Sequence, residues 1–188
     1  MILKRTFDFL LALFFILLLI VPGFFIGVAI RLTSRGPAIY WSDRVGKNNI
    51  IFKMPKFRSM LIDTPPVATH LLMNPESHLT PIGSFLRKYS LDEIPQLLSI
   101  LSGQMSFVGP RPALFNQNDL IEMRDKVGIN SLCPGLTGLA QVSGRDELSL
   151  SEKVRLEVEY MERRSFVFDL KILWVTLLNV IKKQGVSH

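Results

Sequence analysis

An uncharged segment near the N-terminus constrains this fold more than any other feature of the sequence. No charged side chain occurs between Phe9 and Ile30, a run of 22 residues. A straight helix of that length measures about 33 Å, whereas the hydrocarbon core of a bilayer is roughly 30 Å thick. The segment is therefore long enough to enter a membrane, and a simple transmembrane helix is one interpretation.

Two features favour a re-entrant segment instead. Pro22-Gly23 lies inside the run, and a proline there removes a helical hydrogen bond, which leaves halves of about 20 Å and 12 Å that are each too short to span. Basic residues also flank the run on both sides, namely Lys4, Arg5, Arg31 and Arg35. The positive-inside rule then places both ends in the cytoplasm. We predict a re-entrant helix-break-helix over residues 1–35, kinked at Pro22, although the pattern leaves a through-span open.

The charge distribution points to a membrane surface. The net charge is +6, but residues 1–60 hold nine basic and two acidic side chains, whereas residues 61–188 hold thirteen basic and fourteen acidic ones. The basic excess thus lies beside the apolar segment, where it meets anionic lipid headgroups or phosphates. A nucleic-acid-binding protein with a uniformly basic surface would not show this asymmetry, so we expect membrane lipids and no nucleic acid as partners.

Residues 36–188 have the pattern of one compact α+β domain that is mainly helical. Short strand-like runs at 38–41 and 50–52 surround the turn cluster at 46–49, which predicts a small β-hairpin. Helical spacing occurs at 82–88, 91–101, 115–127, 149–163 and 166–181, and residues 133–138 are typical of a turn-rich loop. The 166–181 segment is apolar on most sides, so it either packs on the domain or lies in the membrane interface.

The motif Ser90-Leu91-Asp92-Glu93 has both a structural and a chemical interpretation. The pattern S-x-x-E is a capping box, in which the acidic residues only stabilise a helix start. Pro95 weighs against this, because a helix capped by Ser90 would lose a hydrogen bond at that proline, whereas one capped by Asp92 would not. In the chemical interpretation one carboxylate attacks a phosphorus or holds a metal. Arg111, held between two prolines, then grips phosphate oxygens.

Several further runs, taken together with these, resemble the bacterial sugar transferase family. These are the monotopic phosphoglycosyl transferases that start glycan assembly on undecaprenyl phosphate, and the chain is similar to their minimal form. The matching runs are Lys4–Asp8, Gly36–Tyr40, Arg44–Gly46, Lys56–Met60, Phe85–Gln96, Met105–Pro112, Pro134–Arg145 and Asp169–Ile172. The resemblance covers almost the whole chain.

The resemblance implies a reaction and a set of site residues. A UDP-sugar binds with Mg²⁺, Asp92 attacks the sugar-linked phosphorus and expels UMP, and undecaprenyl phosphate then accepts the sugar phosphate. Glu93 is the expected Mg²⁺ ligand, and Glu157, which stands where the family often has aspartate, is a further metal-ligand position. The expected phosphate- or substrate-binding residues are Arg87, Arg111, Lys56, Arg58, Gln141 and Arg145.

The resemblance also implies a location on the cytoplasmic face of the bacterial inner membrane. The step would be the first membrane reaction of O-antigen, capsule, exopolysaccharide or glycoprotein glycan synthesis. Two rival functions stay open on the residues alone. One is a membrane-anchored binding module without activity, in which Asp92-Glu93 caps a helix, and the other is a transferase with a soluble acceptor. The sequence does not decide the oligomeric state, for which a homodimer is one option.

Overall fold

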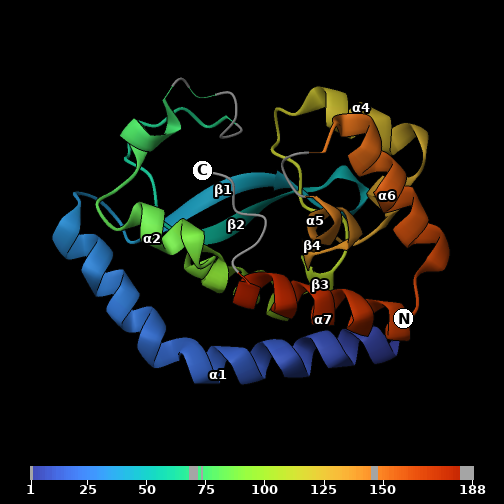
Figure 1. Cartoon of the computed structure of the whole chain (residues 1–188), viewed down its shortest axis with the longest axis horizontal. Coiled ribbons are helices and arrows are strands. Elements are labelled where there is room, and N and C mark those ends of the chain that lie inside the picture. Colours follow the sequence, from blue (N-terminus) through green and yellow to red (C-terminus); the bar gives the residue numbers. More distant parts are fainter. Residues whose placement is uncertain (1, 68–71, 73, 145–147, 183–188) are drawn as a thin grey trace.

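The computed structural model describes residues 2–67, 72, 74–144 and 148–182, and within them the protein is mainly helical with two small sheets (Figure 1). The α-helices are α1 (Ile2–Thr33), α2 (Gly83–Lys88), α3 (Leu97–Ser102), α4 (Asn118–Lys126), α5 (Leu139–Ser143), α6 (Leu150–Arg163) and α7 (Phe166–Lys182). The strands are β1 (Ile39–Val45), β2 (Ile51–Phe57), β3 (Ser106–Val108) and β4 (Gly135–Thr137). The 3₁₀ helices are η1 (Lys47–Asn49), η3 (Pro75–His78), η4 (Leu91–Gln96) and η5 (Ile129–Ser131). A mainly helical α+β chain is what the sequence predicts.

Helix α1 runs along one side of the molecule and changes direction partway along its length (Figure 1). It is a single helix with Pro22 inside it, so the two halves predicted from the sequence are joined in one element. By length and composition the helix is able to cross a membrane, and only 6% of its most apolar window is buried within the protein. A core helix of a soluble domain would be mostly buried, so the exposed apolar side chains of α1 fit a lipid environment better.

Both ends of α1 contact the same globular part of the protein. Near the N-terminus, Lys4 Nζ donates to the carbonyl of Val108 at 3.1 Å and forms an ion pair with Asp169 at 2.6 Å. At the other end, Arg58 Nη2 donates to the carbonyl of Ser34 at 3.1 Å and to its hydroxyl at 2.7 Å. The globular part therefore lies alongside α1 rather than beyond one of its ends.

The predicted β-hairpin is confirmed and is longer than the sequence indicates. Strands β1 and β2 pair antiparallel, with a register that runs from Ile39 opposite Phe57 to Val45 opposite Ile51. The turn contains Asn48 and Asn49 with φ of 55° and 60°, in the left-handed region that asparagine tolerates better than most residues. The hairpin places Lys56 near the end of β2, next to the segment that contains Asp92 and Glu93.

A second sheet, formed by β3 and β4, is not predicted by the sequence. The two strands pair in parallel, with Ser106 opposite Gly135 and Val108 opposite Thr137. Residues 133–138, interpreted as a turn-rich loop, thus contain a strand. A Cβ added to Gly135 would lie 2.1 Å from the backbone nitrogen of Gly109, so this close approach requires glycine.

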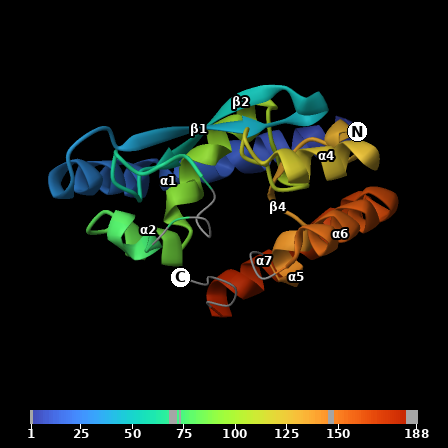
Figure 2. The ribbon, with the colours of Figure 1, turned by 90° about the horizontal axis from the view of Figure 1, so that it is seen from above.

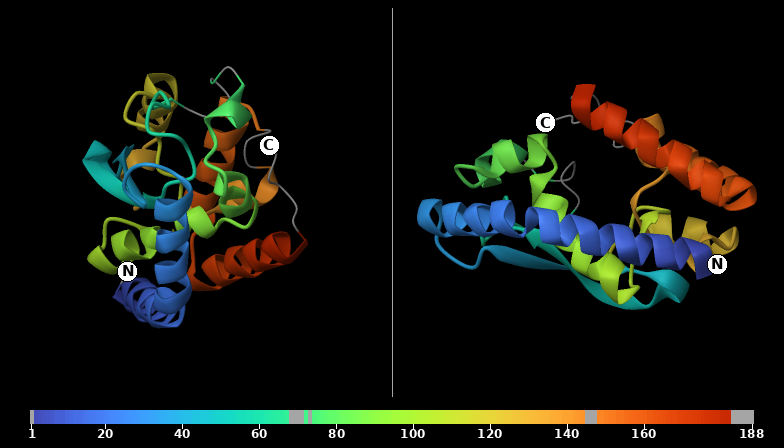
Figure 3. Two further views of the ribbon diagram at one scale, coloured as in Figure 1. Left: turned by 90° about the vertical axis from the view of Figure 1, so that its left-hand side faces the viewer. Right: turned by 90° about the horizontal axis from the view of Figure 1, so that it is seen from below.

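Helices α6 and α7 lie on the opposite side of the molecule from the hairpin (Figure 2). Helix α6 begins with a capping box, because Ser149 Oγ accepts from the Glu152 backbone and the Glu152 carboxylate accepts from the Ser149 backbone. Helix α7 meets α1 where the rings of Phe7 and Phe166 lie 5.2 Å apart, and the two helices diverge toward the C-terminal end of α7 (Figure 3, right).

Candidate functional site

Asp92 and Glu93 lie on η4, directly after a sharp turn from α2. Ser90, which precedes η4, adopts a left-handed conformation with φ 53° and ψ 23°, unusual for a residue other than glycine. Ser90 makes no side-chain capping hydrogen bond at the start of η4, so the capping box that the sequence pattern indicates does not form. The turn instead places Asp92 in a buried position, with 8% of its surface exposed.

The side chain of Glu93 joins three separate segments of the chain. Its Oε1 accepts from Lys56 Nζ on β2 at 3.3 Å and from Arg111 Nη2, in the loop after β3, at 2.7 Å. Lys56 and Glu93 are nearly buried, whereas the Arg111 side chain is 41% exposed and thus reachable from solvent. The structure therefore brings Asp92, Glu93, Lys56 and Arg111 together, although they are far apart in sequence.

Burial changes the protonation equilibria of this cluster. Desolvation raises the pKa of Asp92 above its ordinary value and the neighbouring Glu93 carboxylate adds to the increase, while Lys56, Arg87 and Arg111 oppose it. Desolvation likewise lowers the pKa of Lys56, against the attraction of Glu93. Arg87, at the end of α2, contributes through its charge on Asp92, so it belongs to the same cluster.

Arg44 also belongs to this cluster, and the sequence interpretation did not select it. Its Nε donates to Ser42 Oγ at 3.0 Å and its Nη1 to the carbonyl of Pro112 at 3.2 Å. Burial and the nearby charge of Arg111 lower the pKa of Arg44 to about 10, and Glu93 opposes the decrease. No local pattern in the sequence marks Arg44, because its position depends on the pairing of β1 with β2 and with Leu114.

Arg58 lies at a different place from the one expected for a phosphate-binding residue. It donates to the backbone of Arg35 and to Ser34, at the C-terminal end of α1, and it is buried there. A Cβ added to Gly36 would meet Arg58 Nη1, so the guanidinium fills the corner between α1 and β1. In the structure Arg58 fixes the end of α1 to the hairpin.

Glu157, expected as a metal-ligand position, has an arginine as its partner. Both of its carboxylate oxygens accept from Arg124, with Nε to Oε2 at 2.8 Å, and both side chains are buried. Arg124 Nη2 also donates to the carbonyl of Arg111 at 2.9 Å. Glu157 therefore supports the backbone of Arg111 through Arg124. Within the described ranges, no group of three or more His, Cys, Asp or Glu side chains is arranged to hold a metal ion.

Gln141 and Arg145 were expected near the site from the same long loop. Gln141 is 9% exposed, and its Oε1 and Nε2 have no hydrogen-bond partner within the part of the chain that the structure describes. A buried amide without partners is costly, so an orphan of this kind points to a ligand or water. Arg145 lies outside the described residues.

A large groove opens between the diverging helices α1 and α7, with a volume of about 730 Å³. Ser90, Glu93 and Gln141 line its polar part. Its apolar walls include Leu11, Phe15 and Leu19 of α1 and Leu173, Trp174 and Leu177 of α7. The groove therefore connects the carboxylate cluster to the apolar helices that are most exposed.

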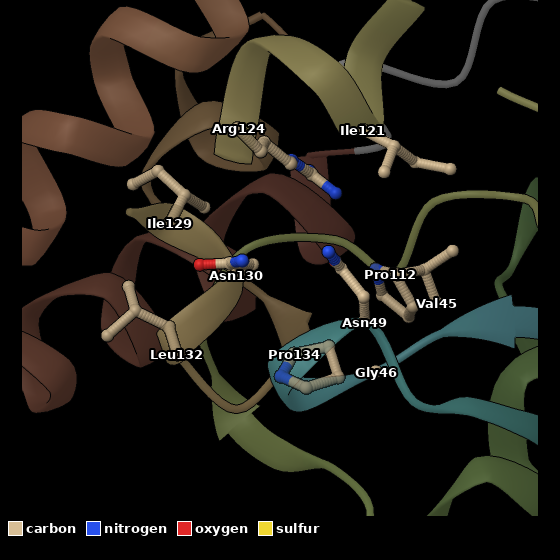
Figure 4. Close-up of a pocket in the computed structure, with 10 residues that line it drawn as sticks. All are labelled: Val45, Gly46, Asn49, Pro112, Ile121, Arg124, Ile129, Asn130, Leu132 and Pro134. Carbon is tan, nitrogen blue, oxygen red and sulfur yellow. The ribbon is translucent and has the colours of Figure 1, made fainter. Parts of the chain in front are cut away.

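A second cavity is too small to hold a substrate. It lies beside Arg124, between the hairpin turn and η5, with a volume of about 20 Å³ (Figure 4). That volume suffices for about one water molecule. Neither Asp92 nor Glu93 lines it.

Comparison with known proteins gives a consistent result over the full length. The family model described as bacterial sugar transferase matches residues 1–183. An uncharacterized sugar transferase, EpsL, of Bacillus subtilis (strain 168) is 37% identical over 188 residues, covering 100% of this chain and 92% of EpsL. The undecaprenyl-phosphate galactose phosphotransferase of Salmonella typhimurium is 35% identical, covering 97% of this chain but 41% of that protein.

The UDP-glucose:undecaprenyl-phosphate glucose-1-phosphate transferase of Escherichia coli (strain K12) is 39% identical, covering 93% of this chain and 39% of the relative. The chain thus spans about two fifths of the length of these two relatives and nearly all of EpsL.

Proposed function

This chain belongs to the bacterial sugar transferase family and is a transferase, and on that premise we propose that it transfers a sugar 1-phosphate from a UDP-sugar to undecaprenyl phosphate. The products are polyprenyl-diphosphate-sugar and UMP. The reaction takes place on the cytoplasmic face of the bacterial inner membrane. It is the first membrane step of a surface or glycoprotein glycan.

One observation carries this proposal: the adjacent carboxylates Asp92 and Glu93 are surrounded by basic side chains, and Glu93 also lines a large apolar groove. Glu93 forms ion pairs with Lys56 and Arg111, and the charges of Lys56 and Arg87 act on the carboxylate of Asp92. Basic side chains around a diphosphate neutralise charge as a phosphoryl group moves. The groove provides the apolar surface that a polyprenyl chain needs next to that chemistry.

In the proposed mechanism Asp92 is the nucleophile. Its carboxylate oxygen attacks the sugar-linked phosphorus, the bond from that phosphorus to the UMP oxygen breaks, and UMP leaves with the bonding electrons. The acyl phosphate then carries the sugar. A phosphate oxygen of the polyprenyl acceptor attacks the same phosphorus and releases the Asp92 carboxylate. An ionised carboxylate has no proton to lose, so the attack needs no general base.

Mg²⁺ fits this site as an ion that takes most of its ligands from the substrate. Mg²⁺ is typically held by one or two carboxylates together with phosphate oxygens and water, and Asp92-Glu93 offers that donor set. Glu93 would hold the ion, which would screen the diphosphate charge when bound. Glu157 is turned to Arg124 and is not part of this donor set.

The contacts at both ends of α1 support a re-entrant topology. A domain that holds Lys4 through Asp169 and Ser34 through Arg58 lies on one side of the bilayer, and both ends of α1 lie on that side with it. The bent helix then enters and leaves the same leaflet. In this topology we expect the groove at headgroup depth, near the acceptor phosphate.

Release of UMP is the direct test. The full chain in detergent or nanodiscs, supplied with UDP-sugars and undecaprenyl phosphate, should release UMP, and Asp92→Asn should reduce the rate by a factor on the order of 10³ or more. Asp43→Asn, which removes an exposed carboxylate on β1, is the matched control and should retain full activity. Incubation with UDP-sugar alone should add a sugar phosphate to the peptide containing Asp92.

Other outcomes identify the rival functions. A wild-type protein that binds UDP-sugar but releases no UMP would be a binding module. Turnover that does not depend on the polyprenyl acceptor would indicate a soluble acceptor. A folded Asp92→Asn variant that retains most activity would refute the covalent mechanism.

A further inference from the structure

Arg44 is held rigidly in a position that the mechanism above does not use. Its strand is bonded on two sides, to β2 through the pairing with Phe52 and to the segment after Arg111 through a bridge with Leu114. The backbone nitrogen of Val45 also donates to the carbonyl of Ala113 at 2.9 Å. The loop that presents Arg111 is thus built onto β1 directly beside Arg44.

The guanidinium of Arg44 keeps donors available for a ligand. Nε is used by Ser42 and Nη1 by the carbonyl of Pro112, and neither partner carries a negative charge. Its Nη2 group makes no hydrogen bond to any residue in the described part of the chain, and it is not among the atoms sealed from solvent. A largely buried cation with a free pair of N–H donors is suited to bind an anion.

The charges of the cluster are arranged in an order across the site. Arg87, Lys56 and Arg111 act on Asp92, whereas Arg44 acts on Lys56 and interacts with Glu93 and Arg111, and it is not among the charges that shift the pKa of Asp92. Arg44 therefore lies at the Glu93 end, away from the nucleophile. A diphosphate that presents one phosphorus to Asp92 extends its other phosphate toward that end.

The cluster also contains more positive than negative charge. Four basic side chains, Arg44, Lys56, Arg87 and Arg111, face two carboxylates, Asp92 and Glu93. An excess of positive charge in a partly buried cluster favours the binding of an anion there. The excess of two matches a diphosphate better than a single neutral sugar.

We propose that Arg44 binds the phosphate attached to uridine, which becomes the phosphate of the leaving UMP. The proposal rests on the transfer reaction proposed above and adds a residue to its donor site. The Arg44 guanidinium donates through Nη2 to the nucleotide phosphate, while Arg111 bridges the two phosphates. Arg44 makes no contact with the phosphate of the polyprenyl acceptor.

The test measures UMP affinity, by calorimetry on the full chain and as competitive inhibition against UDP-sugar. Arg44→Gln should weaken UMP binding roughly tenfold to a hundredfold, because it removes a charge-assisted hydrogen bond. The KM for undecaprenyl phosphate should not change. Lys53→Gln, which removes a positive charge from an exposed position on the same hairpin, is the matched control and should bind UMP like wild type.

A double-mutant cycle separates binding from positioning of Arg111. If Arg44 binds phosphate itself, Arg44→Gln should weaken UMP binding further in an Arg111→Gln background. If it only holds the loop through the Pro112 carbonyl, it should have no further effect there, which would overturn the proposal. Arg44→Lys keeps the charge and should lose less affinity than Arg44→Gln, and it serves as the test if Arg44→Gln does not fold.

The remaining outcomes distinguish this proposal from the transfer reaction itself. An unchanged UMP affinity in folded Arg44→Gln, or a loss confined to the polyprenyl acceptor, would overturn the role of Arg44 while the transferase stands. A wild-type protein without UMP release would refute the transfer reaction, and calorimetry with UMP would still decide whether Arg44 binds the nucleotide phosphate.

Discussion

At the scale of single residues, the ionised carboxylate of Asp92 is expected to lower the stability of the fold. Its pKa is raised by burial, so the folded protein binds this proton more tightly than the unfolded chain does. Stability from this group is therefore present below the ordinary pKa of 3.8 and is lost as pH rises through the folded value. At neutral pH Asp92 is ionised, and the desolvation of its charge lowers the free energy of unfolding.

Asp92→Asn should accordingly raise the melting temperature at pH 7 to 8 while it abolishes turnover. The difference from wild type should shrink as the pH is lowered through the folded pKa and below the ordinary value of 3.8, where Asp92 becomes protonated in both the folded and the unfolded state. Differential scanning fluorimetry over a pH series measures this, with Asp43→Asn as the control. An Asp92→Asn variant that melts below wild type at pH 8 would show that Lys56 and Arg87 outweigh the burial of Asp92.

The buried pair Arg124–Glu157 leads to a second expectation at this scale. Arg124→Met leaves Glu157 buried without its partner, which should cost about 3–5 kcal/mol of unfolding free energy. Lys126→Met breaks the exposed pair with Glu122 on the same helix and should cost less than about 1 kcal/mol. Chemical denaturation of both variants gives the comparison.

A variant of Glu157 distinguishes a structural role, through Arg124, from a role as a metal ligand. If Glu157 supports Arg111 through Arg124, Glu157→Gln should lose stability and turnover, and added Mg²⁺ should restore neither. Recovery of activity at high Mg²⁺ would instead favour a metal-ligand role for Glu157.

The sequence allowed part of the site to be predicted at this scale. Asp92, Glu93 and Arg111 could be selected because the two carboxylates precede Pro95 in an S-x-x-E motif and the arginine is flanked by two prolines. Arg44 has no such pattern, since its place in the cluster depends on a strand register and on the pairing with Leu114. Arg58 and Glu157 looked equivalent to the other charged candidates, because sequence gives no information on which partner a buried charge will have.

At the scale of elements, we expect the groove between α1 and α7 to bind the polyprenyl chain of the acceptor. Leu177 lines the groove on α7, whereas Val167 is exposed on the same helix and does not. Leu177→Asp places a charge against the bound polyprenyl chain and should raise the KM for undecaprenyl phosphate about tenfold or more. Val167→Asp should have little effect on that KM.

The half-reactions provide the internal check. Formation of the sugar-phosphate adduct from UDP-sugar alone should proceed normally in Leu177→Asp, because that step needs no acceptor. Equal losses in both variants, or a slower adduct step, would show that the groove does not bind the acceptor.

The sequence pattern predicted the long helices and the hairpin better than it predicted the short strands β3 and β4. The helices at 149–163 and 166–181 and the hairpin are close to the predicted ranges, because periodicity and turn residues are strong local signals. The pair β3–β4 has three residues in each strand and a partner 29 residues away, so neither strand carries a periodicity that could be detected. The region 91–101 divides into η4 and α3 because Pro95 interrupts regular helical bonding.

At the scale of the whole molecule, the position of α1 relative to the membrane is the main expectation. Single cysteines at Ile2 and Arg35, in a chain where Cys133 is replaced by serine, report on the two ends of α1. Both should react with a membrane-impermeant maleimide only from the cytoplasmic side. Labelling from opposite sides would establish a through-spanning helix and would require the contacts at one end of α1 to be broken.

The ion pair between Lys4 and Asp169 has a consequence for biogenesis. Lys4 and its partner Asp169 are 165 residues apart along the chain, so Lys4 is synthesised well before Asp169. At 5–20 residues per second, that interval lasts roughly 8 to 33 s. During that interval α7 is not yet available to pack against α1, whose apolar side chains are free to enter the bilayer. We therefore expect α1 to associate with the membrane before α7 is made, and the Lys4–Asp169 ion pair then fixes α7 to a helix that is already in the lipid.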